Sequence, residues 1–128
     1  MDAAKPRVLV VDDDDPIRIM LAKIVERLNM SVDTARDGEE AIRQIDSDGY
    51  SAIVLDLMMP KVDGYAVLRH MEQHHRDRLA CTIIATAVPQ PEIARRFNVP
   101  VYRIHSKPFD ISRLMADIKD CVESATRN

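Results

Sequence analysis

Short apolar runs alternate with amphipathic segments along the 128-residue chain. Strands are predicted where the apolar runs are short, and these strands span 8–11, 31–35, 52–56, 81–85 and 100–104. Between them, apolar side chains at helical spacing predict helices, which span 16–28, 37–45, 64–75, 91–97 and 111–122. Residues 124–128 are expected to form a polar tail.

The strand 52–56 has the most informative pattern. Apolar residues, two of them β-branched, run straight into Asp56, which is typical of a strand buried on both faces. A loop with Pro60 and Asp63-Gly64 follows. A lone acid at the carboxyl end of a buried strand is placed to bind a ligand, although such a residue can also cap a helix or start a turn.

Strand and helix alternate five times, which predicts an α/β fold with a doubly wound parallel sheet and helices on both faces. The carboxyl ends of parallel strands meet at one edge of such a sheet. The polar residues expected to gather there are Asp12, Asp13, Asp56, Thr86 and Lys107.

The acidic run Asp12 to Asp15 has two explanations. Asp14 or Asp15 can cap the next helix, for which Pro16 suits the first position. Asp12 and Asp13 are left over at the end of a buried strand. Adjacent carboxylates repel one another, so a cation or solvent must offset their charge.

This combination of groups indicates phosphoryl chemistry. Grouped carboxylates suit Mg²⁺, which prefers oxygen ligands and retains several waters. The hydroxyl of Thr86 and the ammonium of Lys107 suit an anion, and the carboxylate of Asp56 can attack phosphorus in line. A buried Asp56–Lys107 ion pair without chemistry is the alternative, but it leaves Asp12 and Asp13 unexplained.

Four motifs in order resemble the receiver domain of the two-component response regulator family. They are Val10-Val11-Asp12-Asp13-Asp14, the segment 56–64, Thr86-Ala87 and Lys107-Pro108-Phe109. The resemblance covers about residues 7–124 and implies a flavodoxin-like three-layer (βα)₅ sandwich with strand order 2-1-3-4-5.

The resemblance also implies a role for each matching residue. Asp56 is the expected phosphoacceptor, and Mg²⁺ is expected on Asp13, Asp56 and the backbone carbonyl of Met58, with Asp12 acting through water. Thr86 and Lys107 are expected to hold the phosphoryl group, and the Lys107-Pro108 bond is expected to be cis. The implied partners are a sensor histidine kinase or histidine phosphotransfer protein and a downstream protein.

The sequence departs from the family pattern on one side. An aromatic residue usually lies three positions before the lysine, where this chain has Ile104. Tyr102 is the candidate to replace it, because even spacing along a strand places the two side chains on one face. The fourth helix is also short and flanked by prolines. We therefore expect normal phosphorylation with signalling through an unusual surface.

Two small features concern the lifetime of the phosphorylated state. Met58 is apolar and cannot orient an attacking water, and Ala87 leaves the site open. These residues predict slow self-dephosphorylation that an external phosphatase could accelerate.

Composition narrows the function further. A net charge of −3 implies no basic surface for nucleic acid. No targeting segment or apolar run of membrane-spanning length is visible, so a cytoplasmic protein is expected.

Neither the cysteines nor the clustered histidines predict a metal site. Cys81 and Cys121 lack metal-ligand spacing and are expected to be reduced and buried. His70, His74 and His75 are expected at a solvated helix end, because no nearby carboxylate or cysteine completes a ligand set.

Three functions remain open at this point. The first is a single receiver domain over 1–128, a signalling switch rather than an enzyme, with no output domain after residue 124. The second is a docking module that keeps the fold without phosphorylation. The third is a haloacid-dehalogenase-like phosphatase, since Asp12-Asp13-Asp14 contains an Asp-x-Asp motif. Against the third, no acidic pair follows Lys107 at the end of another strand.

Overall fold

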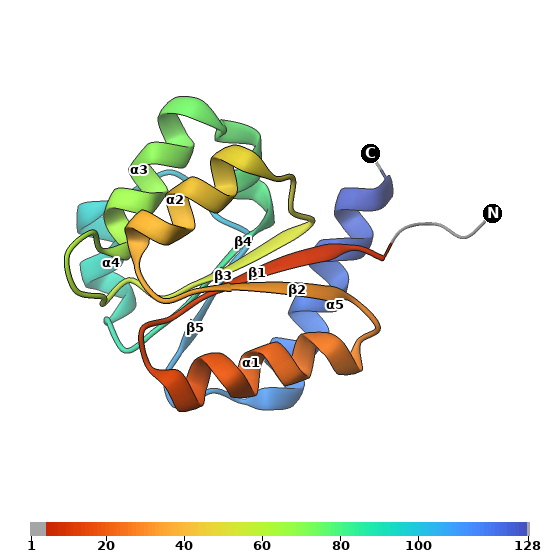
Figure 1. Ribbon diagram of the computed structural model, residues 1–128. Coiled ribbons are helices and arrows are strands. Elements are labelled where there is room, and N and C mark those ends of the chain that lie inside the picture. Colours follow the sequence, from red (N-terminus) through yellow and green to blue (C-terminus); the bar gives the residue numbers. More distant parts are fainter. Residues whose placement is uncertain (1–4, 128) are drawn as a thin grey trace.

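A five-stranded parallel sheet forms the centre of the molecule (Figure 1). The computed structural model describes residues 5–127. The strand order is β2-β1-β3-β4-β5, as predicted. The strands are β1 (Arg7–Val11), β2 (Ser31–Ala35), β3 (Ala52–Leu55), β4 (Thr82–Thr86) and β5 (Arg103–Ser106).

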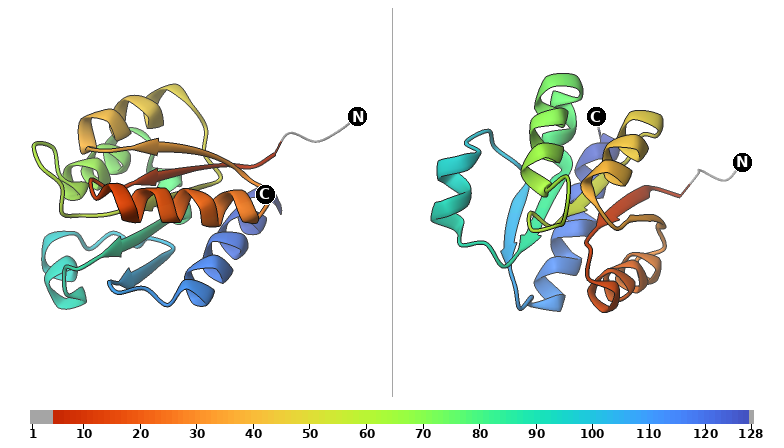
Figure 2. Two further views of the ribbon diagram at one scale, coloured as in Figure 1. Left: turned by 60° about the horizontal axis from the view of Figure 1, so that its bottom comes forward. Right: turned by 60° about the vertical axis from the view of Figure 1, so that its left-hand side comes forward.

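Helices cover both faces of the sheet and complete a three-layer α/β sandwich (Figures 1 and 2). One face carries α1 (Asp15–Arg27) and α5 (Ile111–Arg127). The other carries α2 (Gly38–Ser47), α3 (Gly64–His74) and α4 (Gln90–Arg96). A 3₁₀ helix, η1 (Arg76–Cys81), leads from α3 into β4.

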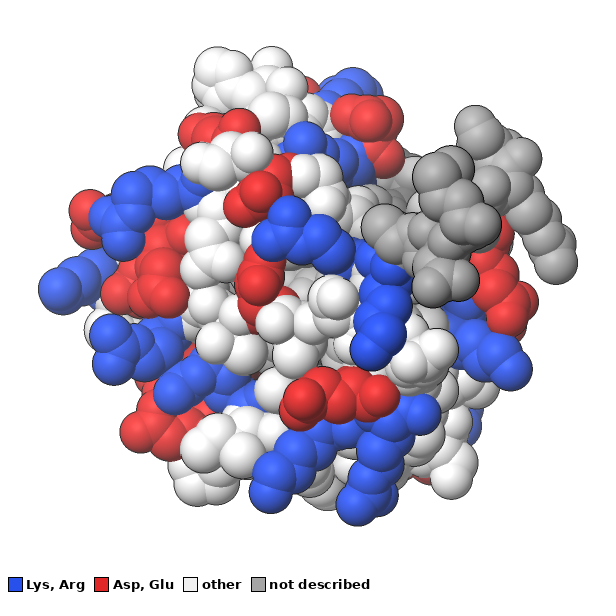
Figure 3. All heavy atoms as spheres, turned by 45° about the vertical axis from the view of Figure 1, so that its right-hand side comes forward, with Lys and Arg blue, Asp and Glu red and all other residues white. Residues whose placement is uncertain are grey.

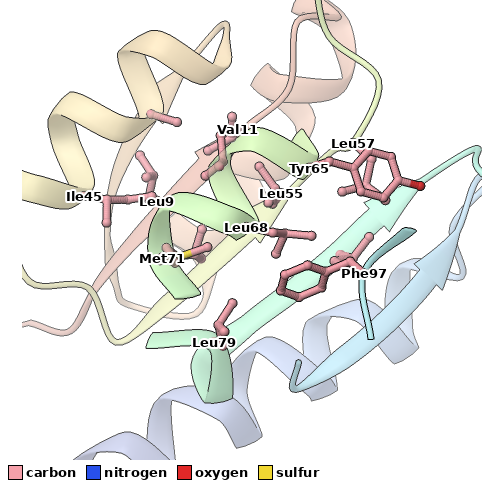
Figure 4. Packing of buried hydrophobic residues seen from close by; sticks show 14 of the residues in the cluster. Leu9, Val11, Ile45, Leu55, Leu57, Tyr65, Leu68, Met71, Leu79 and Phe97 are labelled. Carbon is pink, nitrogen blue, oxygen red and sulfur yellow. The ribbon is translucent and has the colours of Figure 1, made fainter. Parts of the chain in front are cut away.

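Alternation along the strands divides the core between the two faces. In β1, Leu9 and Val11 face α2 and α3, whereas Val8 and Val10 face α1 and α5. Figure 4 shows the first of these clusters, in which Leu9, Val11 and Leu55 lie under the apolar residues of α3. Strands β1, β3 and β4 are therefore buried on both faces, which is why they read as continuous apolar runs.

Acidic caps start four of the helices at the carboxyl edge of the sheet, including α5, which begins after Asp110. Asp14 caps α1 by accepting from the Ile17 N–H at 3.0 Å, and Asp37 caps α2 by accepting from Glu40 at 2.8 Å. Asp63 caps α3 in the same way. These bonds satisfy N–H groups that a helix leaves unpaired at its first turn. Asp14 rather than Asp15 is thus the cap of α1.

Most predicted boundaries differ from the structure by one or two residues, and three differences have an identifiable reason. Strand β5 begins at Arg103 rather than Pro100, because Pro100 has no N–H to donate and the neighbouring valines pack into the core without pairing. Cys81 ends η1 and does not begin β4. The expected tail continues α5 to Arg127, since no glycine or proline follows Val122 to end the helix.

The surface is mixed in charge. Lys and Arg side chains alternate with Asp and Glu over the face shown in Figure 3 and form no single basic patch there. Among the described residues, no helix has both the length and the apolar composition to cross a bilayer.

Candidate functional site

The backbone of β3 delivers Asp56 to the carboxyl edge of the sheet. Its N–H donates to the carbonyl of Val11 at 3.0 Å, which extends the pairing of β3 with β1 by one residue. The side chain is only 4% exposed. One carboxylate oxygen accepts from the Met58 N–H at 3.2 Å, and the other accepts from Lys107 Nζ at 3.1 Å.

Asp12 occupies the corresponding position after β1. Its N–H donates to the Ala35 carbonyl at 3.2 Å, and its side chain is 1% exposed. Oδ1 accepts from the Asp14 N–H at 2.9 Å, and Oδ2 accepts from Lys107 Nζ at 3.0 Å. Arg18 of α1 donates to the Asp12 carbonyl at 3.0 Å. Sequence analysis did not identify Arg18, because nothing in helical periodicity distinguishes it from other surface cations.

Lys107 joins these two carboxylates. Its backbone N–H donates to the Thr86 carbonyl at 2.9 Å, which places the side chain just beyond the end of β5. The bond to Pro108 is cis, as expected. Burial alone would lower the pKa of Lys107, but the carboxylates of Asp12 and Asp56 outweigh burial and raise it. The ammonium therefore stays charged.

The surroundings of Asp12 disfavour the charged form of its carboxyl group. Burial raises its pKa above the ordinary value, and the charge of Asp56 acts in the same direction. Hydrogen bonds from the Asp14 N–H and from Lys107 oppose that rise. Two buried carboxylates thus share one ammonium, which leaves negative charge available for a further cation.

The geometry of the three acids fits a hard divalent cation. Carboxylate oxygens of Asp12, Asp13 and Asp56 all lie within 4.8 Å of one another. Asp13 is exposed and faces a pocket of about 450 Å³ that Met58 also lines. An oxygen-only donor set with an open side suits Mg²⁺, which binds through few carboxylates and keeps several waters.

Close backbone packing shapes the loop between β3 and α3. A Cβ at Gly64 would lie 2.5 Å from the Leu57 Cα, and a Cβ at Gly38 would lie 2.8 Å from the Val62 carbonyl carbon. The N–H groups of both glycines donate into this loop at 3.0 Å. Only glycine permits such an approach, so the loop is held against α2 and α3 with Met58 61% exposed at its rim.

Thr86 lies at the same edge but forms a local hydrogen bond. It is the last residue of β4 and is fully buried. Its hydroxyl accepts from the Val88 N–H at 3.4 Å. Ala87, between the two, is exposed.

Ile104 and Tyr102 occupy opposite faces of the sheet, so the expectation of one shared face was wrong. Ile104 pairs with Ile84 and packs into the cluster under α2, α3 and α4. Tyr102 precedes β5 and packs into the cluster under α1 and α5. The rule of two-residue alternation fails because Tyr102 is in a bend and not in the strand.

Two residues that sequence analysis did not identify also line the pocket. The guanidinium carbon of Arg96, on α4, lies 3.8 Å from the ring centroid of Tyr65, on α3. Figure 4 shows the Tyr65 hydroxyl pointing away from the aliphatic cluster. That hydroxyl is buried without a hydrogen-bond partner among the described residues. No local sequence signal predicts a contact between two separate helices.

Comparison with known families identifies the class of protein. The model of the response regulator receiver domain matches residues 8–119. The chain therefore belongs to this family of two-component signalling proteins, and the haloacid dehalogenase alternative is not supported.

The curated relatives that the chain matches are described as response regulators and transcriptional regulatory proteins. The chain is 32% identical over 120 residues to the response regulator MprA of Mycolicibacterium vanbaalenii, which covers 94% of this chain and 52% of that protein. It is 33% identical over 117 residues to the transcriptional regulatory protein PrrA of Mycobacterium leprae, covering 91% and 49%. The chain thus spans about half the length of these relatives.

Solved structures share the architecture. The receiver domain of Francisella response regulator 1452 superposes with a TM-score of 0.82 at 28% identity, covering 93% of this chain and 98% of that one. The response regulator TrrA of Thermotoga maritima, in complex with Mg²⁺ and BeF, superposes with a TM-score of 0.78 at 27% identity, covering 91% and 98%.

Proposed function

We propose that this chain is a phosphorylation switch in which Asp56 accepts a phosphoryl group in a Mg²⁺-dependent reaction. The donor is a phosphohistidine on a sensor histidine kinase or a histidine phosphotransfer protein. The observation that carries the proposal is the bridge from Lys107 to the buried carboxylates of Asp12 and Asp56, beside the exposed Asp13.

The acids divide the binding of the metal between them. Asp13 and Asp56, with the Met58 backbone carbonyl, would hold Mg²⁺ directly, and Asp12 would hold it through water. Bound there, Mg²⁺ supplies positive charge that offsets the oxygens of the transferring group. The oxygen-rich, open donor set supports this assignment.

In the transfer step, a carboxylate oxygen of Asp56 attacks phosphorus in line with the bond to the donor histidine. The new P–O bond forms as the P–N bond breaks, and the electron pair of that bond stays on the imidazole. Lys107 is placed to contact the phosphoryl oxygens, because its ammonium already lies 3.1 Å from Asp56. We propose no turnover of other substrates.

Thr86 would transmit the effect of phosphorylation from Asp56 to the surface of the domain. Its hydroxyl accepts a bond from Val88 here and still has its own proton to donate. Donating that proton to a phosphoryl oxygen would pull on the turn that leads into α4. Ile104 lies on the side of the sheet that α4 covers, so we propose that Ile104, and not Tyr102, adjusts with it.

The first test is the mass of the intact protein after incubation with acetyl phosphate, with and without Mg²⁺. A gain of one phosphoryl group is expected in the wild type with Mg²⁺ and in neither the Asp56→Asn variant nor the metal-free sample. Asp63→Asn is the matched control, because Asp63 caps α3 and is assigned no role in transfer.

Each other outcome has a definite meaning. No gain in any sample, at several pH values, would contradict the proposal and leave the phosphorylation-independent docking module. A gain that persists in Asp56→Asn would place the acceptor elsewhere. Steady hydrolysis of p-nitrophenyl phosphate would instead indicate a phosphatase.

A further inference from the structure

A second cluster of ionisable groups lies far from the acidic site, where α2 and α3 end. These two helices lie side by side on one face of the sheet (Figures 1 and 2). Asp46 Oδ1, near the end of α2, lies 2.8 Å from His70 Nε2 and 2.7 Å from His75 Nε2, near the end of α3. The expectation that no carboxylate accompanies these histidines was wrong, because Asp46 is 24 residues away in sequence from His70.

The donor atoms are close enough for one ion. The three ligand atoms all lie within 4.8 Å of one another. Ligands of a tetrahedral Zn²⁺ lie about 3.4 Å apart, given metal–ligand bonds of about 2.0–2.1 Å. Small side-chain rotations would therefore suffice, and all three residues retain solvent exposure that permits such rotations.

The surroundings also favour a cation. Helix carbonyls left unpaired at a C-terminus carry partial negative charge, and the ends of both α2 and α3 are next to this cluster. The guanidinium of Arg78 already donates to the Ile45 carbonyl near the end of α2. Two imidazoles and one carboxylate form a set that binds Zn²⁺ and its neighbours in the first transition row, with solvent completing the coordination.

We propose that Asp46, His70 and His75 form a binding site for a divalent transition metal ion, with Zn²⁺ as the representative ligand. The site is separate from the acidic one, which has only oxygen donors and suits Mg²⁺. It does not depend on the proposed phosphorylation. Its occupation would fasten the end of α2 to the end of α3.

His74 and His105 provide controls within the same chain. His74 is exposed, and its ring lies tilted beside that of His70 with 4.7 Å between centroids, but it is outside the three-residue set. His105 Nε2 lies 2.7 Å from Asp117 Oδ2 and so reproduces a single histidine–carboxylate pair without a second histidine. These are the remaining two of the four histidines.

The test is calorimetric titration of ZnCl₂ into tag-free protein, in excess Mg²⁺ so that the acidic site is occupied. One Zn²⁺ per chain is expected, with a rise in Tm and, when Co²⁺ replaces Zn²⁺, visible absorption from a low-coordinate site. His75→Asn and Asp46→Asn should each weaken binding at least tenfold, about the loss that even outer-shell changes cause. His105→Asn and His74→Gln should bind as the wild type does.

Several results would overturn the site. These are no binding by the wild type, equal affinity in the wild type and His75→Asn, or a tenfold loss in His105→Asn. An equal loss in His74→Gln would show that the ligand set is wrong. Circular dichroism of the metal-free variants separates loss of a ligand from loss of the fold, and the two ligand variants on different helices give independent readings.

Discussion

The two ends of the sheet carry opposite arrangements of charged groups. At the carboxyl end, one ammonium lies between two buried carboxylates. At the other end, one exposed carboxylate lies between two partly exposed imidazoles. A buried charge needs a partner, whereas solvent screens an exposed one. The charges of the first cluster therefore depend on one another within the folded core. Those of the second can exchange partners with little loss of free energy.

The backbone shows the same contrast. Gly64, at the carboxyl end, has no room for a methyl group, whereas Gly49, between α2 and β3, has no atom within 4 Å of an added Cβ. Chemistry that needs fixed distances is thus placed where the chain is most tightly packed. Four substitutions would test this difference.

Lys107→Met should have the largest effect. Loss of the ammonium removes a contact to the developing phosphoryl charge, so the rate of phosphorylation by acetyl phosphate should fall on the order of 10²-fold. The remaining carboxylates then lack their internal cation, so Mg²⁺ should bind more tightly. Stopped-time mass measurements and calorimetry would check the two effects. A parallel fall in rate and metal affinity would contradict this account.

Gly64→Ala should destabilise the fold by about 1–3 kcal/mol, as overpacking does. The methyl group would collide with the Leu57 backbone beside Asp56. Gly49→Ala is the matched control and should leave the urea unfolding midpoint nearly unchanged. Equal effects of the two substitutions would show that the two ends are packed alike.

Met58→Asn should shorten the lifetime of the phosphorylated state about tenfold. The exposed methionine cannot position water, whereas an amide can orient it without taking its proton, so the gain should stay below the 10²–10⁴-fold of general base catalysis. The half-life of the phosphorylated protein measures this. An unchanged half-life would mean that water reaches phosphorus by another route.

Asp46→Asn should have the smallest effect, a change in how the free energy of unfolding depends on pH. Hydrogen bonds from His70 and then His75 hold the pKa of Asp46 below its ordinary value. The stability they contribute is present above the ordinary value of about 3.9 and is lost as the pH falls through the lower folded-state pKa. Without metal, the variant should be less stable by under about 1 kcal/mol at pH 6. Urea midpoints should converge as the pH falls below 4; a gap that widens would reverse the sign.

Most of the carboxyl end could be predicted from sequence. Strands buried on both faces are recognisable in the sequence as continuous apolar runs. A parallel sheet then brings the carboxyl ends of these strands together at one edge. Asp12, Asp56 and Lys107 were therefore expected at one edge, where the structure places them. Hydrogen-bond directions were not predictable, as Thr86 shows by bonding to Val88.

The other failures share a cause. Tyr102 was assigned to a face by a rule that holds only inside a strand, and β5 begins one residue later. Asp46 was overlooked because its partners come from another helix. Local pattern predicts elements, but it does not predict where a strand starts or which side chains meet between helices.

The bond from Lys107 to Asp12 spans 95 residues, and the bond to Asp56 spans 51. During synthesis, the acids therefore leave the ribosome long before their cation does. A chain that has not yet added β5 to the sheet has its proposed acceptor but not the ammonium beside it. A domain generally folds as a unit, and only α5 follows Lys107, so the centre is complete only when nearly all of the chain has been made. We therefore expect a copy that ends before β5 to accept phosphate poorly.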